Sequence, residues 1–221
     1  QKTPRGGESG MSVNLLWLRR DLRLHDHAAL HAALKEQSPV QPVFIFDTEI
    51  LKRFDNPRDR RLTFIAEALY QLDQKLRERG GELLVFHGKA TEIIPKLATK
   101  LNAEKIFAAE DFEPATRKRD ALVSAQTTLE LVTDHVMAHP NYVLKEDGSP
   151  FRVFTPYSKA WHAKRNELYD AERPIKDKNR YVKSDPALLK NFKRIDISQG
   201  AEKALLQINY RYSDLGEWKI D

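Results

Sequence analysis

Short apolar runs alternate with amphipathic segments along most of the chain, and this alternation restricts the fold more than any other feature. Five runs predict buried strands, over 13–18, 40–47, 82–88, 103–110 and 129–137. The segments between them carry apolar residues at helical spacing, and the links are short. Such strand–helix–strand units form right-handed crossovers between parallel strands. The sequence therefore predicts an α/β fold, a doubly wound five-stranded parallel sheet of the Rossmann-like type.

Four helices are expected between the strands, over 25–37, 58–79, 90–101 and 113–126. Asp26 is a candidate N-cap for the first of them and Thr91 for the third. Gly80 and Gly81 follow the long second helix and are typical of a helix C-terminus.

The last third of the chain has a different character. Asp147-Gly148 lies between two apolar-alternating arms and predicts a hairpin over 142–155, which a helix over 156–169 follows. The chain is then charged and interrupted by prolines, as linkers are. We expect four parts: a tag or disordered extension over 1–10, an α/β domain over 11–169, a charged linker over 170–200, and the start of a truncated helical domain or a divergent tail over 201–221.

Composition excludes several classes of protein. The 41% hydrophobic and 31% charged residues are ordinary for a globular chain. No apolar run approaches the roughly 20 residues that cross a bilayer, so no membrane partner is expected. The chain has no cysteine, which excludes disulfides and thiolate chemistry, and a cytoplasmic location is the default expectation. The first ten residues lack the apolar centre of a signal peptide.

Positive charge is concentrated near the end of the chain. Residues 152–194 hold 12 Lys and Arg against 5 Asp and Glu, in a chain with a net charge of +5. A basic segment can face nucleic acid. A solvated surface is the commoner role for a charge run of this kind.

Charged side chains follow the predicted strands where each strand ends. Open parallel sheets bind ligands outside the carboxyl ends of their strands. The side chains at those ends are Arg19, Arg20, Asp21, Arg23, Asp47, His87, Glu110, Asp111 and Glu113. They form either a ligand site or a set of structural ion pairs, and their types alone do not separate the two.

Several familiar site motifs are missing from the chain. It has no G-x-G-x-x-G and no G-x-x-x-x-G-K-[ST], so neither a dinucleotide Rossmann site nor a P-loop is expected. It has no G-x-S-x-G nucleophile elbow. His27 and His31 are spaced i, i+4, but no Cys or clear third ligand completes a set, so no metal is expected.

The segment WLRRDLRLHDHAAL resembles the first strand–loop–helix signature of the DNA photolyase and cryptochrome family, W-x-R-x-D-L-R-x-x-D-N-x-A-L. His27 stands where the family usually has Asn. Three later segments are similar to the family in order and spacing: VFIFDTEIL, EDFEPATRKRDALV and DGSPFRVFTPYSKAW. The resemblance covers about residues 13–165.

The resemblance implies light-driven chemistry in a longer parent protein. Photolyases split cyclobutane pyrimidine dimers by electron transfer from reduced FAD to a base flipped out of the duplex. FAD and the dimer bind in a large helical C-terminal domain, which would begin where this chain stops. We therefore expect FAD only in a full-length parent, the helical FAD domain as the partner where it is present, and no repair activity by this chain alone.

The resemblance further implies an antenna chromophore in the N-terminal domain: a reduced folate, a deazaflavin, FMN, or none. Its implied contacts are Arg19, Arg20, Phe44, Phe46, Asp47, Arg61, Asp111 and Glu113. The carboxylates would accept hydrogen bonds from ring or ribityl groups, and Arg61 would offer a planar donor face. Ala115 and Thr116 replace the Asn-Glu pair of folate-binding members, which favours a deazaflavin or FMN. Asp21 and Arg23 would lock the first loop.

Two other functions remain open at this point. A nucleotide-binding module could keep the fold and bind an adenine nucleotide at the same edge. An interaction domain could instead use the apolar face meant for the helical half, and exposed Phe154, Tyr157 or Trp161 would then favour self-association. Any DNA binding by the basic segment should be non-specific, salt-sensitive and weaker than ~10⁻⁴ to 10⁻⁶ M.

Overall fold

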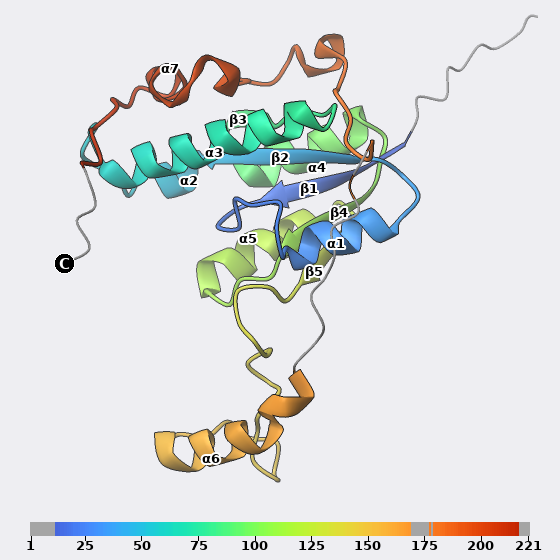
Figure 1. The fold of residues 1–221 in the computed structure, drawn as a ribbon, viewed down its shortest axis with the longest axis vertical. Helices are drawn as coiled ribbons and strands as arrows, with labels where there is room; N and C mark the ends of the chain where they lie inside the picture. The colour runs from blue at the N-terminus through green and yellow to red at the C-terminus, as the bar shows by residue number, and fades with distance from the viewer. Residues whose placement is uncertain (1–11, 169–176, 178, 217–221) are drawn as a thin grey trace, which may run out of the picture.

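A five-stranded parallel sheet with helices on both faces forms the body of the protein (Figure 1). The structure is a computed structural model that describes residues 12–168, 177 and 179–216. The strands are β1 (Val13–Leu18), β2 (Val40–Asp47), β3 (Leu84–Gly88), β4 (Ala103–Ala109) and β5 (Leu129–Val132). Their order is β3-β2-β1-β4-β5, and all pairs are parallel. The predicted fold class is confirmed, and the order reverses between β1 and β4.

Two apolar layers hold the helices to the sheet because side chains alternate along each strand. Leu16 and Leu18 of β1 face one layer, with α1 (Ala28–Lys35), α3 (Arg60–Glu78) and α7 (Ala201–Gln207). Leu15 and Trp17 face the other layer, with α4 (Ala90–Lys100) and α5 (Pro114–Ser124). The remaining helical elements are α2 (Thr48–Leu51), α6 (Phe154–Lys164), η1 (Arg165–Leu168), η2 (Pro186–Leu189) and η3 (Ile197–Gln199).

Two predicted helix caps are wrong. His27, not Asp26, caps α1, because its Nδ1 accepts the backbone N–H of Leu30 at 3.1 Å. Asp26 has a φ of 43°, in the left-handed region of the turn before the helix. At α4 the N-cap is Lys89, without a side-chain hydrogen bond, and Thr91 lies inside the first turn.

The predicted hairpin over 142–155 is also wrong, although its turn forms. Gly148 has a φ of 77°, and the N–H of Lys145 donates to the carbonyl of Ser149 at 3.0 Å. No strand flanks this turn among the described residues, because β5 ends at Val132 and the next element is α6. Helix α6 buries none of its side chains and lies away from the sheet in Figure 1.

The described part of 170–200 packs on the sheet, whereas its composition predicts a solvated linker. Four of its side chains are buried: Tyr181, Leu189, Ile195 and Ile197. The N–H of Val40 donates to the carbonyl of Arg180 at 2.7 Å, and the N–H of Ile195 donates to Val85 at 2.8 Å. A Cβ at Gly81 would lie 2.4 Å from Cβ of Tyr181, so this contact requires glycine. Spaced apolar residues among the charges supply the packing face.

The last described helix, α7, packs against α3. Ala204, Leu205 and Ile208 are buried there. No helix in the described residues has the length and apolarity that crossing a membrane requires.

Candidate functional site

An accessible charged cluster lies where the strand order reverses, at the carboxyl ends of β1 and β4. Arg20 Nη2 donates to Glu113 Oε1 at 2.9 Å, and Arg20 Nε lies 3.4 Å from Asp111 Oδ2. Asp111 Oδ1 also accepts the backbone N–H of Glu113 at 3.2 Å, which fixes the turn before α5. The side chains of Arg20 and Glu113 are 60% and 54% exposed, so a ligand can reach both.

Asp111 and Arg20 are both charged at neutral pH. Burial by itself raises the pKa of Asp111, but the hydrogen bond from Glu113 and the charges of Arg20, Arg19 and His135 outweigh it, and the pKa lies below its usual range. The hydrogen bond to Glu113 holds the pKa of Arg20 above its usual value, against desolvation. The cluster therefore offers carboxylate acceptors and a guanidinium donor side by side.

Arg19 lies beneath the cluster instead of bordering a cleft, with a side chain only 7% exposed. Its Nη1 donates to both Asp120 oxygens at 2.6 Å, and its Nη2 donates to the carbonyl of Ala109. Arg119 donates to the same carboxylate at 3.1 Å. Both guanidinium groups lie over Trp17, at 5.0 and 4.7 Å from the ring centroid.

Sequence reasoning missed this buried group as a unit. Trp17, Arg119 and Asp120 all fit the two quoted signature segments, but nothing in those segments joins the three residues to one another. The signal that could have found this group is the Arg119–Asp120 pair. It follows Pro114 by about one and a half helical turns, in a helix that comes directly after a buried strand and so begins at the same edge of the sheet.

The three predicted contacts from β2 are buried. Phe44 and Phe46 are buried, with ring centroids 5.1 Å apart in an edge-to-face arrangement. Asp47 is buried as well, and its Oδ1 accepts the N–H of Glu49 at 3.0 Å, which caps α2. These residues can support a ligand at the edge of the sheet more readily than they can surround one.

Arg61 stands apart from the other predicted site residues. It makes a bidentate pair with Asp59, through Nε at 3.0 Å and Nη2 at 2.7 Å. Its guanidinium lies 4.5 Å from the ring centroid of Phe54. Both partners belong to the link between α2 and α3, so the structure joins Arg20, Asp111 and Glu113 but does not bring Arg61 to them.

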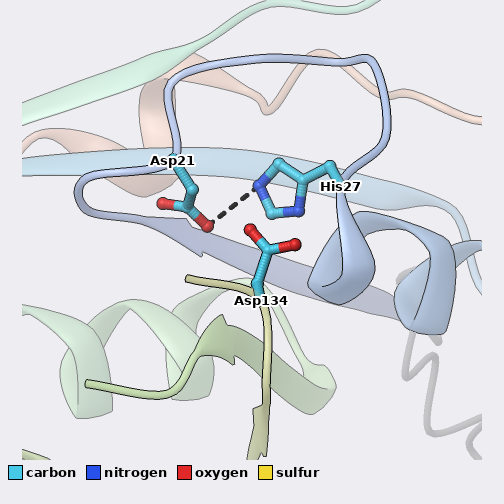
Figure 2. Close-up of side chains that lie close together, drawn as sticks. All are labelled: Asp21, His27 and Asp134. Carbon is cyan, nitrogen blue, oxygen red and sulfur yellow. Dashed lines mark ion pairs between the residues drawn. The ribbon is translucent and has the colours of Figure 1, made fainter. Parts of the chain in front are cut away.

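A second, buried group fixes the first loop (Figure 2). His27 Nε2 lies 2.9 Å from Asp21 Oδ2, and Asp134 faces both side chains from the end of β5. Asp21 Oδ1 accepts the N–H of Arg19 at 2.8 Å. Arg23 Nη2 donates to Asp134 Oδ2 at 2.8 Å. Asp21 and Arg23 thus lock the first loop, and hence Arg19 and Arg20, to the end of β5.

The ligand atoms of Asp21, His27 and Asp134 lie within 4.8 Å of one another, a separation that could suit a metal ion. The hydrogen bonds argue against it. His27 Nδ1 accepts from Leu30, so the neutral ring carries its proton on Nε2, which a metal would have to displace. Asp134 already accepts from Arg23 and from the N–H of Ala28 at 3.0 Å. We therefore interpret the group as a hydrogen-bonded lock.

A separate groove of about 440 Å³ opens at the carboxyl ends of β2 and β3. Its walls include Lys52, Phe54, His87 and Tyr210. Burial lowers the pKa of His87, and the charge of Lys193 lowers it further. The groove shares no lining residue with the Arg20 cluster.

Curated relatives match about two thirds of the chain. A Deoxyribodipyrimidine photo-lyase of Streptomyces griseus is 36% identical over 69% of this chain and 35% of its own length. One from Synechococcus sp. (strain ATCC 27144) is 33% identical over 67% of this chain and 32% of its own. An uncharacterized 31.6 kDa protein of Synechococcus sp. (strain PCC 6716) is 34% identical over 68% of this chain and 55% of its own. The chain thus spans about a third of the photolyases that it matches.

Solved structures share the fold. An archaeal photolyase from Sulfolobus tokodaii gives a TM-score of 0.67 at 24% identity, over 92% of this chain and 43% of that one. A cryptochrome from Synechocystis sp. gives 0.64 at 23% identity, over 82% and 38%. The model of the DNA photolyase family matches residues 14–176, which contain all of the parallel sheet except Val13, the first residue of β1. The chain therefore belongs to the DNA photolyase family, of which it carries the N-terminal α/β domain.

Proposed function

We propose that this chain is a light-harvesting domain that binds an antenna chromophore of the deazaflavin or FMN class at the carboxyl edge of its sheet. The observation that carries the proposal is the exposed Arg20–Asp111–Glu113 cluster at the strand-order reversal between β1 and β4. Such a chromophore, when bound, absorbs light and passes its excitation to FAD. A structure of the family from Sulfolobus tokodaii is described as holding two FAD molecules, with a light-harvesting cofactor implied.

Each residue of the proposed site has a distinct task. Asp111 and Glu113 accept hydrogen bonds from ring or ribityl groups, and Arg20 donates to a carbonyl or phosphate oxygen. Arg19 holds the loop from beneath, while Phe44, Phe46 and Asp47 form the support on the β2 side. Arg61 joins the site only if the link between α2 and α3 shifts, because its guanidinium is paired with Asp59 and lies over the ring of Phe54.

The partners belong to the same proposal. The excitation would pass to the helical FAD domain of a photolyase-like parent, in which DNA repair would take place, and the unburied helix α6 is a candidate contact with that domain. DNA binding by this chain alone would be weak and non-specific, and its cellular location cytoplasmic.

The test is an absorption and fluorescence titration of the chain with riboflavin 5′-phosphate, a deazaflavin and a reduced folate. We expect saturable binding of one of the first two and weaker binding of folate. Asp111→Asn keeps an acceptor for the N–H of Glu113 but removes the charge, and it should weaken binding by about tenfold. Glu146→Ala, an exposed carboxylate in the turn before α6, is the control and should bind as the unmodified chain does.

Two results would contradict the proposal. Absence of saturable binding by all three compounds would remove the antenna role. Competition by ATP at the same site, with tighter binding than any chromophore, would indicate a nucleotide-binding module instead.

A further inference from the structure

Trp17 is a buried indole at the functional edge of the sheet. It is the second-last residue of β1, and only 2% of it is exposed. The guanidinium groups of Arg19 and Arg119 lie over its ring at 5.0 and 4.7 Å. Two cations therefore act on one aromatic ring from different parts of the fold, the loop after β1 and helix α5.

These positive charges are only partly balanced. Arg19 and Arg119 share a single close carboxylate, Asp120, through contacts of 2.6 and 3.1 Å. The next carboxylate that acts on Arg119 is Asp47, through space and without a hydrogen bond to it. The side chains of Arg19, Arg119 and Asp120 are only 7%, 16% and 3% exposed, so water screens their charges weakly.

A positive charge beside an indole makes the indole a poorer electron donor. Loss of one electron turns the ring into a radical cation, and nearby guanidinium groups repel the new charge. The neutral ring, in contrast, is stabilised by the same cations. Both effects raise the free energy required to oxidise Trp17.

Such protection matters beside an excited flavin-type ring, which is a strong one-electron oxidant. An unprotected indole would give it one electron, forming an indole radical cation and a one-electron-reduced chromophore, and the return of that electron would release the excitation as heat. Arg19 links Trp17 to the proposed site. Its guanidinium lies over the Trp17 ring and donates to the carbonyl of Ala109, two residues before Asp111, and the next residue in the chain is Arg20.

We propose that Arg19 and Arg119 suppress electron transfer from Trp17 to the excited antenna chromophore and so preserve the excitation for transfer. The inference rests on the proposed function and adds a role for two arginines that do not need to touch the chromophore. It also gives a reason for two buried guanidinium groups to share one carboxylate beside the site.

The experiment measures the fluorescence lifetime of riboflavin 5′-phosphate bound to the full chain, at equal occupancy set by titration. Arg119→Met keeps the apolar stem but removes the charge, and it should shorten the lifetime several-fold. The double variant Trp17→Phe with Arg119→Met should restore it, because phenylalanine is a far weaker donor. Arg117→Met is the matched control, since Arg117 is on the same helix but lies over Phe112, 5.6 Å from its centroid.

Trp17→Phe alone provides a second test that leaves every charge in place. It should leave the lifetime unchanged, because Trp17 does not donate an electron to the chromophore while both arginines are present. A longer lifetime in this variant would show that Trp17 quenches despite the arginines, and would overturn the inference, as would an unaltered lifetime in Arg119→Met. Absence of binding by the unmodified chain would instead overturn the proposed function, and this inference with it.

Discussion

His27, which stands where the family signature has Asn, caps helix α1. Its Nδ1 accepts the N–H of Leu30, and its Nε2 faces the buried Asp21. Burial alone would raise the pKa of Asp21, but its interaction with His27, together with the hydrogen bond from the N–H of Arg19, holds that pKa below its usual range. One imidazole thus both caps a helix and pairs a buried carboxylate.

The first prediction separates these two tasks of His27. His27→Ala removes the cap and leaves Asp21 buried without its partner, so we expect a loss of about 1–3 kcal/mol in the free energy of unfolding. His27→Asn keeps a capping oxygen and an amide donor, and it should cost less. Urea unfolding followed by circular dichroism measures both, and equal losses would argue against the capping role.

The second prediction concerns Asp120, the carboxylate that Arg19 and Arg119 share. Asp120→Asn leaves two mostly buried guanidinium groups without a counter-charge, and we expect a loss of about 3–5 kcal/mol in the free energy of unfolding. Glu49→Gln breaks the exposed pair with Lys52 and should leave stability nearly unchanged. Similar losses in the two variants would mean that burial does not set the strength of these pairs.

At the scale of elements, the C-terminal segments complete the α/β domain. Helix α7 adds to the layer of α1 and α3, and the chain before it extends contacts along β2 and β3 through Tyr181 and Ile195. Helix α6 has the opposite character: Phe154 is 78% exposed, Tyr157 is exposed, and Trp161 is half-buried with its ring edge-on to His162. The self-association that such exposure could favour remains a prediction.

The third prediction tests the packing of α7 with two adjacent leucines. Leu205 is fully buried and Leu206 is 44% exposed. Leu205→Ala should lower the free energy of unfolding by about 2–5 kcal/mol because it leaves a cavity against α3. Leu206→Ala, with the same change of volume on the solvent side, should have little effect. If chemical denaturation found both harmless, α7 would be dispensable for the domain.

At the scale of the whole molecule, buried and paired carboxylates make stability depend on pH. The pKa values of Asp21 and Asp111 are lowered in the folded chain. Their contribution is therefore complete above the unfolded value of about 3.9 and is lost as pH falls through the folded values. His87, whose pKa is lowered by burial, adds a smaller loss that begins near the usual histidine value of about 6.5.

The fourth prediction is a fall in the free energy of unfolding on acidification, slight from pH 6.5 and steep below pH 4. Urea titrations from pH 7 to pH 3 measure it. Asp21→Asn should flatten the steep part, since the variant has no carboxylate to protonate at that position. A free energy of unfolding that is constant down to pH 3 would contradict the pairing of these carboxylates.

The sequence by itself determined the parallel sheet, the helices between its strands and the charged residues at the carboxyl edge, because periodicity and strand–helix alternation are local properties of the chain. Only the tertiary structure decided which of those charges meet. Arg20 reaches Asp111 and Glu113, whereas Arg19 turns inward to Asp120 and Arg61 remains with Asp59. Local sequence patterns also did not predict the packing of 180–197 or the ion pair of Arg23 with Asp134. These contacts join residues more than 90 positions apart, or depend on side-chain direction, and neither is encoded in a local pattern.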